Sequence, residues 1–341
     1  MLFYISILIV LLLLSFYKCS YKIFVAIVLV LSFFLGFRGE TVGADTQRYV
    51  EYYNYMEYGL GYMEIGWNIL SVTVKHLGFS PYAFHFLIAL LTLSMIAFVL
   101  TRFHDKQINM LGLYFTYSLG FYLLMFNGMR QLFAGAIVLV GFYFLSVNRN
   151  RIFLLTVFFA TLFHGSTIFA LAAYLLRWFK LSQLRVAISL MVTLLIGLLA
   201  SNEFFVSVAG KYAHDIDTYG YRDSLAYAII VGGLSNIFFY YLYVVSGSKI
   251  QDSFWMKLYF LSILVMNATI NIVIGPRIVY IFSISQVVAF SLLAKHISRQ
   301  ETKILLYLFG IITFFRFILP ETAKVEESLI PYYYTFQIYL K

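Results

Sequence analysis

The stretch PYAFHFLIALLTLSMIAFVLT, residues 81–101, contains no Asp, Glu, Lys or Arg. A membrane-spanning helix needs about 20 predominantly apolar residues, so this stretch predicts one transmembrane helix. Runs of the same kind recur on both sides of it, from residue 2 to residue 319. The pattern therefore predicts an all-α fold, a polytopic transmembrane helical protein.

The composition of the chain supports this fold class. Of 341 residues, 62% are hydrophobic and only 11% are charged, whereas a soluble domain carries about 25% charged residues. The net charge is +9, but the basic residues lie singly between apolar runs, so no nucleic-acid partner is expected. The single cysteine, Cys19, excludes an internal disulfide and a thiolate metal cluster. Residues 2–16 have no positive charge before them and Lys18 close after them, and are expected to be a membrane helix, not a cleaved signal.

The apolar segments predict ten spans and one ambiguous stretch. The spans are expected near residues 2–17, 21–37, 81–101, 108–126, 129–147, 185–201, 225–246, 254–274, 277–294 and 304–319. The ambiguous stretch, residues 152–177, forms either one long helix or a hairpin of two short helices. The hairpin would comprise residues 152–163 and 166–177, broken at His164-Gly165-Ser166.

The enrichment of Lys and Arg in cytoplasmic loops decides between these two alternatives. Lys18 and Lys22 place the first loop inside, and only the hairpin then also places Arg177, Lys180 and Arg185 inside. We therefore predict about 12 membrane crossings with both ends outside. Fourteen basic and three acidic residues then lie on the cytoplasmic side, a charge of +11, against ten and twelve, or −2, on the outer side.

Polar sequence is concentrated on the outer side under this topology, in residues 38–79, 202–224 and 320–341. The cytoplasmic loops are short, and the chain contains no GxxxxGK[ST] phosphate loop, which argues against ATP-driven transport by this chain alone. Residues 1–341 are thus expected to form a single integral membrane domain, with its chemistry at the outer membrane face.

The first outer segment offers a candidate anion site. Arg38, Asp45 and Arg48 follow a spanning helix in a glycine-rich turn, an arrangement that suits an anion with an orienting carboxylate. A short helix capped by Asp45 or the next residue would place Asp45, Arg48 and Tyr49 on one face. The alternative is a surface ion pair beside a tyrosine belt at the lipid interface.

Two arginines, Arg130 and Arg277, each open an apolar helix on the outer side. A guanidinium beside a helix N-terminus can capture a phosphate. The alternative is an arginine that snorkels to water, which we expect for Arg316. His164, an ionisable group in apolar sequence, is a candidate general base as a neutral imidazole, with a hydrogen-bonded buried histidine as the alternative.

The second outer segment contains Arg222 and is expected to be a solvated loop or a lid over an outer cavity. His214, Asp215 and Asp217 lie in it, but their spacing is a weak metal signal, and neither a metal nor a cofactor is expected. Several arginines on one side suit a dianionic headgroup, such as a phosphate or pyrophosphate on a lipid. These outer arginines are Arg38, Arg48, Arg130, Arg222 and Arg277.

Five short segments resemble the EpsG family of bacterial polysaccharide polymerases, often grouped with the Wzy-type O-antigen and capsule polymerases. They are FRGETVGADTQRYVEYY (37–53), NGMRQLFAGAIVL (127–139), LFHGSTIFAL (162–171), PRIVYIF (276–282) and IPYYYTF (330–336). Each is short, so the resemblance rests on their order over nearly the whole chain. The large outer loop of many Wzy proteins is replaced here by modest loops, and roles in that loop are not transferred.

The resemblance implies a multi-spanning enzyme of the membrane glycosyltransferase (GT-C-like) class in the bacterial cytoplasmic membrane. Its substrate would be an undecaprenyl-diphosphate-linked oligosaccharide, used at the extracytoplasmic face without a nucleotide sugar or required metal. Membrane lipids, a chain-length regulator and a flippase are the implied partners. The positions that match the family are Arg38, Asp45, Arg48, Tyr49, Arg130, Gln131, His164 and Arg277.

The expected reaction is attack by the hydroxyl of a lipid-linked repeat unit on the anomeric carbon of a growing glycan, with lipid diphosphate leaving. Arg130, Arg277 and Arg38 would stabilise the leaving group, and His164 or Asp45 would be the base. A further expectation is that sugar faces stack on Tyr49, Tyr52 and Tyr53. Three alternatives stay open: an O-antigen-ligase-like transferase, a flippase for lipid-linked sugars, and a membrane acyltransferase.

Overall fold

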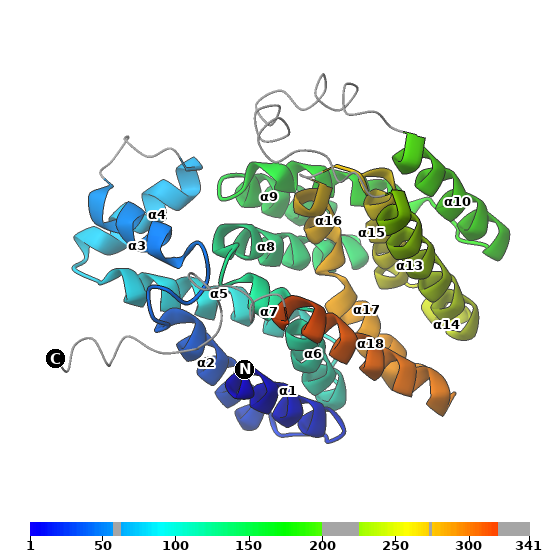
Figure 1. The fold of residues 1–341 in the computed structure, drawn as a ribbon, viewed down its shortest axis with the longest axis horizontal. Helices are drawn as coiled ribbons and strands as arrows, with labels where there is room; N and C mark the ends of the chain where they lie inside the picture. The colour runs from blue at the N-terminus through cyan, green and yellow to red at the C-terminus, as the bar shows by residue number, and fades with distance from the viewer. Residues whose placement is uncertain (57–62, 200–224, 273–274, 320–341) are drawn as a thin grey trace.

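A computed structural model describes residues 1–56, 63–199, 225–272 and 275–319, and within these ranges every regular element is a helix (Figure 1). The expected all-α class is confirmed for this part of the chain. The helices are α1 (Leu2–Ser15), α2 (Tyr21–Gly36), α3 (Thr46–Tyr55), α4 (Ile65–His76), α5 (Pro81–Thr101), α6 (Lys106–Ser118), α7 (Phe121–Leu124), α8 (Met129–Ser146), α9 (Asn150–Thr161), η1 (Gly165–Arg177), α10 (Gln183–Leu199), α13 (Leu225–Val245), α14 (Ser248–Gln251), α15 (Phe254–Ala268), α16 (Gly275–Ser283), α17 (Gln286–His296) and α18 (Gln300–Ile318).

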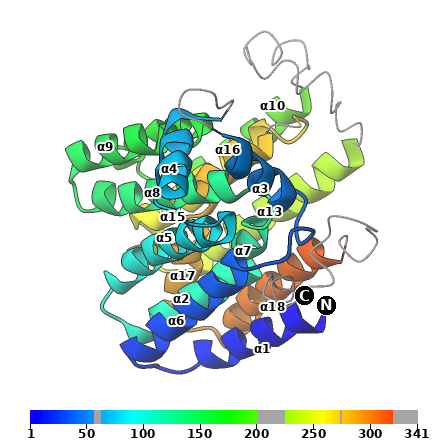
Figure 2. The same cartoon turned by 90° about the vertical axis from the view of Figure 1, so that its left-hand side faces the viewer.

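The centre of the bundle is formed by helices that are apolar all round. Every residue of α6 from Ile108 to Ser118 is buried, and α6 packs against α1, α5, α17 and α18. A helix without a polar face is stable only where other helices or lipid surround it. In Figure 2, α5, α6 and α8 lie inside the bundle, with α1 and α9 on its flanks.

The flanking helices expose apolar side chains. Leu13 on α1 is 56% exposed, Leu155 on α9 66% and Leu184 on α10 71%. Contiguous exposed apolar surface of this kind suits lipid rather than water. Together with the all-helical fold, it fits a helical membrane protein.

Among the described residues, α5 and α8 are individually long and apolar enough to cross a membrane, and α16 with α17 forms a third such span if counted as one bent helix. Seven other apolar helices have 10–17 described residues. The twelve crossings therefore stay a prediction. The fold itself supports a membrane protein built of helices, without fixing how many of them cross.

Two expected spans are interrupted. The span expected at 108–126 ends with α6, because Gly120 has a left-handed φ of +84° and the Phe317 ring occupies the place where a β-carbon would be. The span expected at 277–294 is bent by 44° between α16 and α17. At this bend Ser285 donates its hydroxyl to the Phe282 carbonyl at 2.6 Å, a local bond that competes with the helical pattern.

The expected break at His164 is confirmed. α9 ends at Thr161, His164 is extended, and the 3₁₀ helix η1 begins at Gly165 and packs back against α9. A 3₁₀ helix rises about 2 Å per residue, more than an α-helix. The thirteen residues of η1 therefore reach further than an α-helix of equal length.

Two short helices, α3 and α4, lie at one end of the bundle beside the start of α5 (Figure 1, upper left). α3 begins at Thr46 with Asp45 at the N-cap position, as expected, although no side-chain capping bond of Asp45 is formed. α4 was not expected from the sequence. Its Trp67 is 1% exposed and fixes α4 against the bundle.

Candidate functional site

Three ionisable side chains from distant segments meet at this end of the molecule: Glu64, Arg130 and His164, named here the Glu64 cluster. Arg130 donates from Nη1 to Oε2 of Glu64. The other carboxylate oxygen, Oε1, lies 3.6 Å from Nδ1 of His164 and accepts the backbone N–H of Gly165 at 3.4 Å. One carboxylate thus joins an arginine at the start of α8 to the histidine at the hairpin break.

The backbone holds these segments close together. The N–H of Gly66, in the first turn of α4, donates to the carbonyl of Leu162 at 2.7 Å. A β-carbon at position 66 would also lie 2.7 Å from that carbonyl oxygen, so only glycine allows this approach. The cap position of α4, Glu64, is thereby brought to the break between α9 and η1.

The cluster is partly covered, with the side chains of Glu64 and Arg130 each 24% exposed and that of His164 15% exposed. Burial acts to raise the pKa of Glu64, but the nearby His164 ring and the Arg130 charge outweigh it and lower the pKa from 4.5 to about 2. Glu64 is therefore a carboxylate at neutral pH. It is placed to bind Arg130 and to face the His164 ring while it stays partly exposed to solvent.

Tyr49 lies behind Arg130. Its side chain is buried, with its ring 5.6 Å from that of Trp67 and 6.2 Å from that of His85. Burial raises the pKa of the Tyr49 hydroxyl, against the opposing effect of the Arg130 charge. The hydroxyl therefore stays protonated at neutral pH and positions Arg130 from the protein side.

Tyr52 and Tyr53 also face the protein, with 9% and 2% of their surfaces exposed. The Tyr52 hydroxyl donates to Asn68, and the Tyr53 hydroxyl donates to the carbonyl of Phe79 at 2.9 Å. The structure thus covers the rings that were expected to stack on sugar faces. Their described contacts anchor α3 to α4 and to the start of α5.

Arg38 is completely buried. Its guanidinium donates to the Thr46 hydroxyl at 2.8 Å and to the carbonyls of Leu35 at 2.6 Å and Phe126 at 3.3 Å. It also lies 5.2 Å from the centre of the Phe126 ring. These contacts tie the end of α2 to α3 and to the turn before α8, and leave Arg38 without access to a ligand in this conformation.

The other expected residues fall into two groups. Arg48 and Asp45 form a surface ion pair at 3.9 Å, with Arg48 78% exposed. Gln131, next to Arg130, donates its amide to the backbone carbonyl of Arg277 at 3.0 Å, and the Arg277 side chain is exposed. The structure therefore brings Arg277 to the start of α8, whereas Arg222 lies outside the described residues.

The sequence interpretation missed Glu64, although its signal was present in the segment MEIGW, residues 63–67. A single carboxylate between apolar residues and before a glycine has the same character as His164 in LFHGS. Within the described ranges, no three His, Cys, Asp or Glu side chains group so that they could hold a metal ion. The Glu64 cluster is suited to proton transfer and anion binding by its own side chains.

The chain matches the family model described as the EpsG family over residues 21–334, nearly its whole length. No curated protein and no solved structure matches it.

Proposed function

The chain belongs to the EpsG family, and from that premise we propose that it polymerises a bacterial surface polysaccharide. A growing undecaprenyl-diphosphate-linked glycan is transferred onto a lipid-linked repeat unit at the outer face of the cytoplasmic membrane. The family supports a polysaccharide-polymerase-like function in a membrane. The observation that carries the finer proposal is the Glu64 cluster.

His164 is the base in this proposal. Because Oε1 of Glu64 faces Nδ1 of His164 at 3.6 Å, the carboxylate favours the tautomer with a proton on Nδ1, which leaves Nε2 to accept a proton. Glu64 is ionised, so it also stabilises the imidazolium that forms, as the carboxylate does in a nucleophile–histidine–carboxylate triad. Asp45, the other candidate, faces Arg48 at the surface.

The chemical step needs no external reactant. The acceptor hydroxyl oxygen forms a bond to the anomeric carbon of the donor glycan, while the bond from that carbon to the diphosphate oxygen breaks. The hydroxyl proton passes to Nε2 of His164, and the bonding electron pair leaves with the lipid diphosphate. In this proposal Arg130, whose guanidinium carries five N–H donors, donates to the departing phosphate, and Arg277 approaches from α16.

The same proposal includes the topology. Residues 1–341 form one integral membrane domain with about 12 crossings, both ends outside, and the Glu64 cluster on the outer side. The charge asymmetry of +11 inside and −2 outside supports this orientation. A flippase would supply lipid-linked units to this face, and a chain-length regulator would act on the product.

The test is a polymerisation assay on the purified full-length protein with a lipid-linked repeat unit as both donor and acceptor. We expect a ladder of products on lipid diphosphate. An O-antigen-ligase-like transferase would extend nothing until a different acceptor is added, and a flippase would leave the one-unit substrate unchanged in detergent. Acetate or another acyl group on the glycan would identify an acyltransferase.

A further inference from the structure

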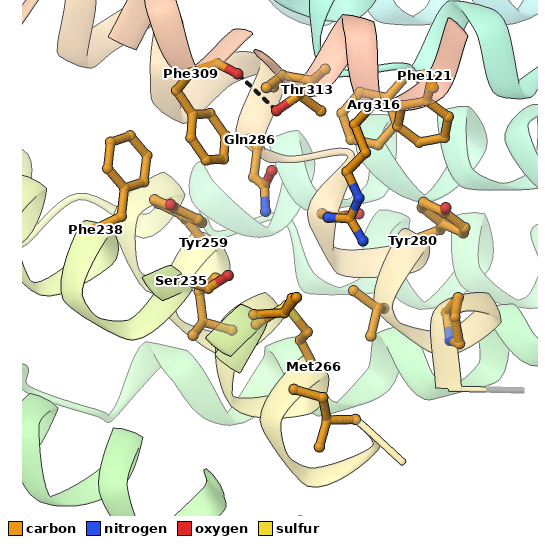
Figure 3. Close-up of a pocket in the computed structure, with 18 of the residues that line it drawn as sticks. Phe121, Ser235, Phe238, Tyr259, Met266, Tyr280, Gln286, Phe309, Thr313 and Arg316 are labelled. Atoms are coloured by element: carbon orange, nitrogen blue, oxygen red, sulfur yellow. Dashed lines mark hydrogen bonds between the residues drawn. The ribbon is translucent and has the colours of Figure 1, made fainter. Parts of the chain in front are cut away.

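A second site lies on the other side of α16, in a cavity of about 330 Å³ (Figure 3). Its walls come from α13, α15, α16, α17 and α18, and none of the Glu64 cluster lines it. The two sites are close along α16: Pro276 and Tyr280 line the cavity, while the carbonyl of Arg277 accepts the bond from Gln131 beside the cluster.

Aromatic rings bound one end of the cavity. Phe238 on α13 and Phe309 on α18 stack with ring centroids 4.3 Å apart, and further along the same two helices the Tyr241 hydroxyl and the Thr302 hydroxyl are 2.9 Å apart. Tyr259 lines the cavity near this stack. A chain that entered from the opposite end would therefore stop at the Phe238–Phe309 stack.

Beyond the stack, α13 and α18 form opposite walls of the cavity through Ser235 and Thr313. The neighbouring residues on the two helices are exposed and apolar: Leu234 is 62% exposed and Ile312 66%. In a membrane these side chains contact lipid. The cavity is thus flanked by lipid-facing surface, and an apolar chain can reach it sideways from the bilayer.

Arg316 gives the cavity its charge. It lies two residues before the end of α18, and Figure 3 shows its guanidinium directed into the cavity, with Tyr280 and Gln286 on either side. A guanidinium binds phosphate oxygens through paired N–H donors. A ligand for this site therefore combines an anionic phosphate head with an apolar tail.

The size of the cavity limits the tail. Small-molecule sites span roughly 300–1,000 Å³, and this cavity of about 330 Å³ takes the first part of one apolar chain, whereas a glycerophospholipid brings two chains from one head. We infer that the cavity seats the head-proximal isoprene units of a single-chain lipid diphosphate, with Arg316 as its phosphate ligand. This inference rests on the proposed function, because it assigns one of the two lipid-linked substrates of the polymerase.

The arrangement separates lipid binding from chemistry. The tail lies between α13 and α18, the phosphates lie at Arg316 and the nearby start of α16, and the sugar extends towards the Glu64 cluster. Arg277, exposed on α16, stands between the two sites. A substrate held in this way presents its sugar to the Glu64 cluster as the acceptor without placing its tail there, and Arg130 stays available to the diphosphate of the donor.

The experiment uses the full-length protein in nanodiscs and a diazirine-bearing polyprenyl diphosphate that carries no sugar. We expect photocrosslinks in the α13 and α18 segments that line the cavity. Ser235→Trp, which fills the cavity, should lower crosslinking at least tenfold. The matched control Ile312→Trp adds the same ring on the lipid-facing side of α18 and should crosslink as the wild type does.

Arg316→Gln is the second variant, at an exposed position where folding is not at issue. We expect its dissociation constant for the probe to rise about tenfold, with Arg316→Lys in between, since lysine keeps the charge but not the paired donors. Inorganic diphosphate should compete with the probe. Competition by phosphatidylglycerol at equal concentration would identify an ordinary phospholipid site and overturn the inference.

Failure of this inference is distinguishable from failure of the proposed function. Crosslinks that stay unchanged in Ser235→Trp, or their absence in the wild type, would overturn the cavity assignment. If the same preparations still elongate a lipid-linked repeat unit, the polymerase proposal stands and its lipid site lies elsewhere. If neither variant nor wild type elongates the unit while the probe binds in the cavity, the function proposal fails and the lipid site remains.

Discussion

At the scale of single residues, the site depends on one carboxylate that faces an arginine and a histidine. Removing one member of a partly buried ion pair leaves an uncompensated charge and costs more than the pair contributed. Glu64 is the shared member, since it contacts both Arg130 and His164. Substitutions of Glu64 should therefore affect stability and activity together, more than those of either partner alone.

The pH dependence of stability tests this role. The pKa of Glu64 is about 2 in the folded protein against 4.5 for a free side chain. Between pH 4.5 and pH 2, Glu64 is therefore protonated more in the unfolded state than in the folded state. The stabilisation is complete above about pH 4.5 and is lost as the pH falls towards 2. This pKa shift corresponds to a contribution of roughly 3 kcal/mol to the free energy of unfolding.

We expect Glu64→Gln to remove most of this pH-dependent difference in denaturant unfolding between pH 5 and pH 2. Glu51→Gln is the matched control, because Glu51 is exposed on α3 and accepts a hydrogen bond from Gln47 on the same helix. Unfolding curves for Glu64→Gln with the same pH slope as the wild type would contradict the pairing of Glu64.

The identity of the base is a second prediction for single residues. His164→Gln should lower the polymerisation rate by about 10² to 10⁴, the usual contribution of a general base. Asp45→Asn should lower the polymerisation rate less than about tenfold. Asp45 belongs to an exposed ion pair, and such pairs contribute little free energy. Rates measured with saturating lipid-linked substrate decide this, and the reverse order would make Asp45 the base.

Residue chemistry was only partly predictable from the sequence. His164 was singled out as an ionisable group in apolar sequence, and Arg130 as a guanidinium at the start of an outer-side helix. Their partner, Glu64, was missed because its contact depends on how α4 docks. Tyr52 and Tyr53 illustrate the same limit: a tyrosine near a membrane exit can face lipid, sugar or protein, and only tertiary packing decides among these.

At the scale of elements, the contact between α4 and the hairpin sets the geometry of the cluster. Gly66→Ala would place a methyl group 2.7 Å from the Leu162 carbonyl. Because both atoms belong to backbone-constrained segments, α4 must shift, at a cost of about 1–3 kcal/mol, the usual range for overpacking. Glu64, two residues away, would move from His164.

We therefore expect Gly66→Ala to lower both the unfolding midpoint and the polymerisation rate. Gly233→Ala is the matched control, since nothing lies within 4 Å of its added methyl group and alanine favours a helix by up to about 1 kcal/mol over glycine. Equal behaviour of the two variants would show that α4 does not need the close approach.

The elements themselves were predictable where hydropathy and charge agree. The hairpin broken at His164 followed from the basic residues that come after it, and α3 followed from the glycine-rich turn before it. The breaks at Gly120 and Ser285 were not foreseen, because an apolar run hides a left-handed residue or a serine bonded to its own backbone. Hydropathy reports where a chain is apolar and not where its axis turns.

At the scale of the whole molecule, the charge asymmetry and the hairpin together predict a topology in which residues 152–177 cross the membrane twice. If residues 152–177 cross once, Ser182 lies outside, and if they cross twice, it lies inside. Ser80, at the start of α5, lies outside in either case. Both serines are exposed helix-capping residues, which makes them a matched pair.

In a Cys19→Ser background, which has no other cysteine, we expect a membrane-impermeant maleimide to label Ser80→Cys in intact cells. Ser182→Cys should react only after the membrane is permeabilised. Labelling of Ser182→Cys from outside would show that residues 152–177 cross the membrane only once. Every later helix would then have the opposite orientation to the predicted one.

The all-α class and the family were both expected from the whole sequence, and the fold and the family match confirm them. The number of crossings was not confirmed by helix length, because several helices of the bundle have fewer than 18 described residues. Short and bent helices can cross only beside partners that satisfy their backbone groups. The composition of a sequence does not show which helices pack beside one another, so it does not show whether such partners are present.

The proposed role of the Glu64 cluster in glycan polymerisation can be tested by the length of lipid-linked glycans in a deletion strain. The strain should accumulate one-unit glycans, and the wild-type chain or Glu51→Gln should restore long polymer. Glu64→Gln, present in the membrane at equal amount, should leave one-unit glycans. Polymer of normal length from Glu64→Gln, or units trapped on the cytoplasmic face in the deletion strain, would contradict the account.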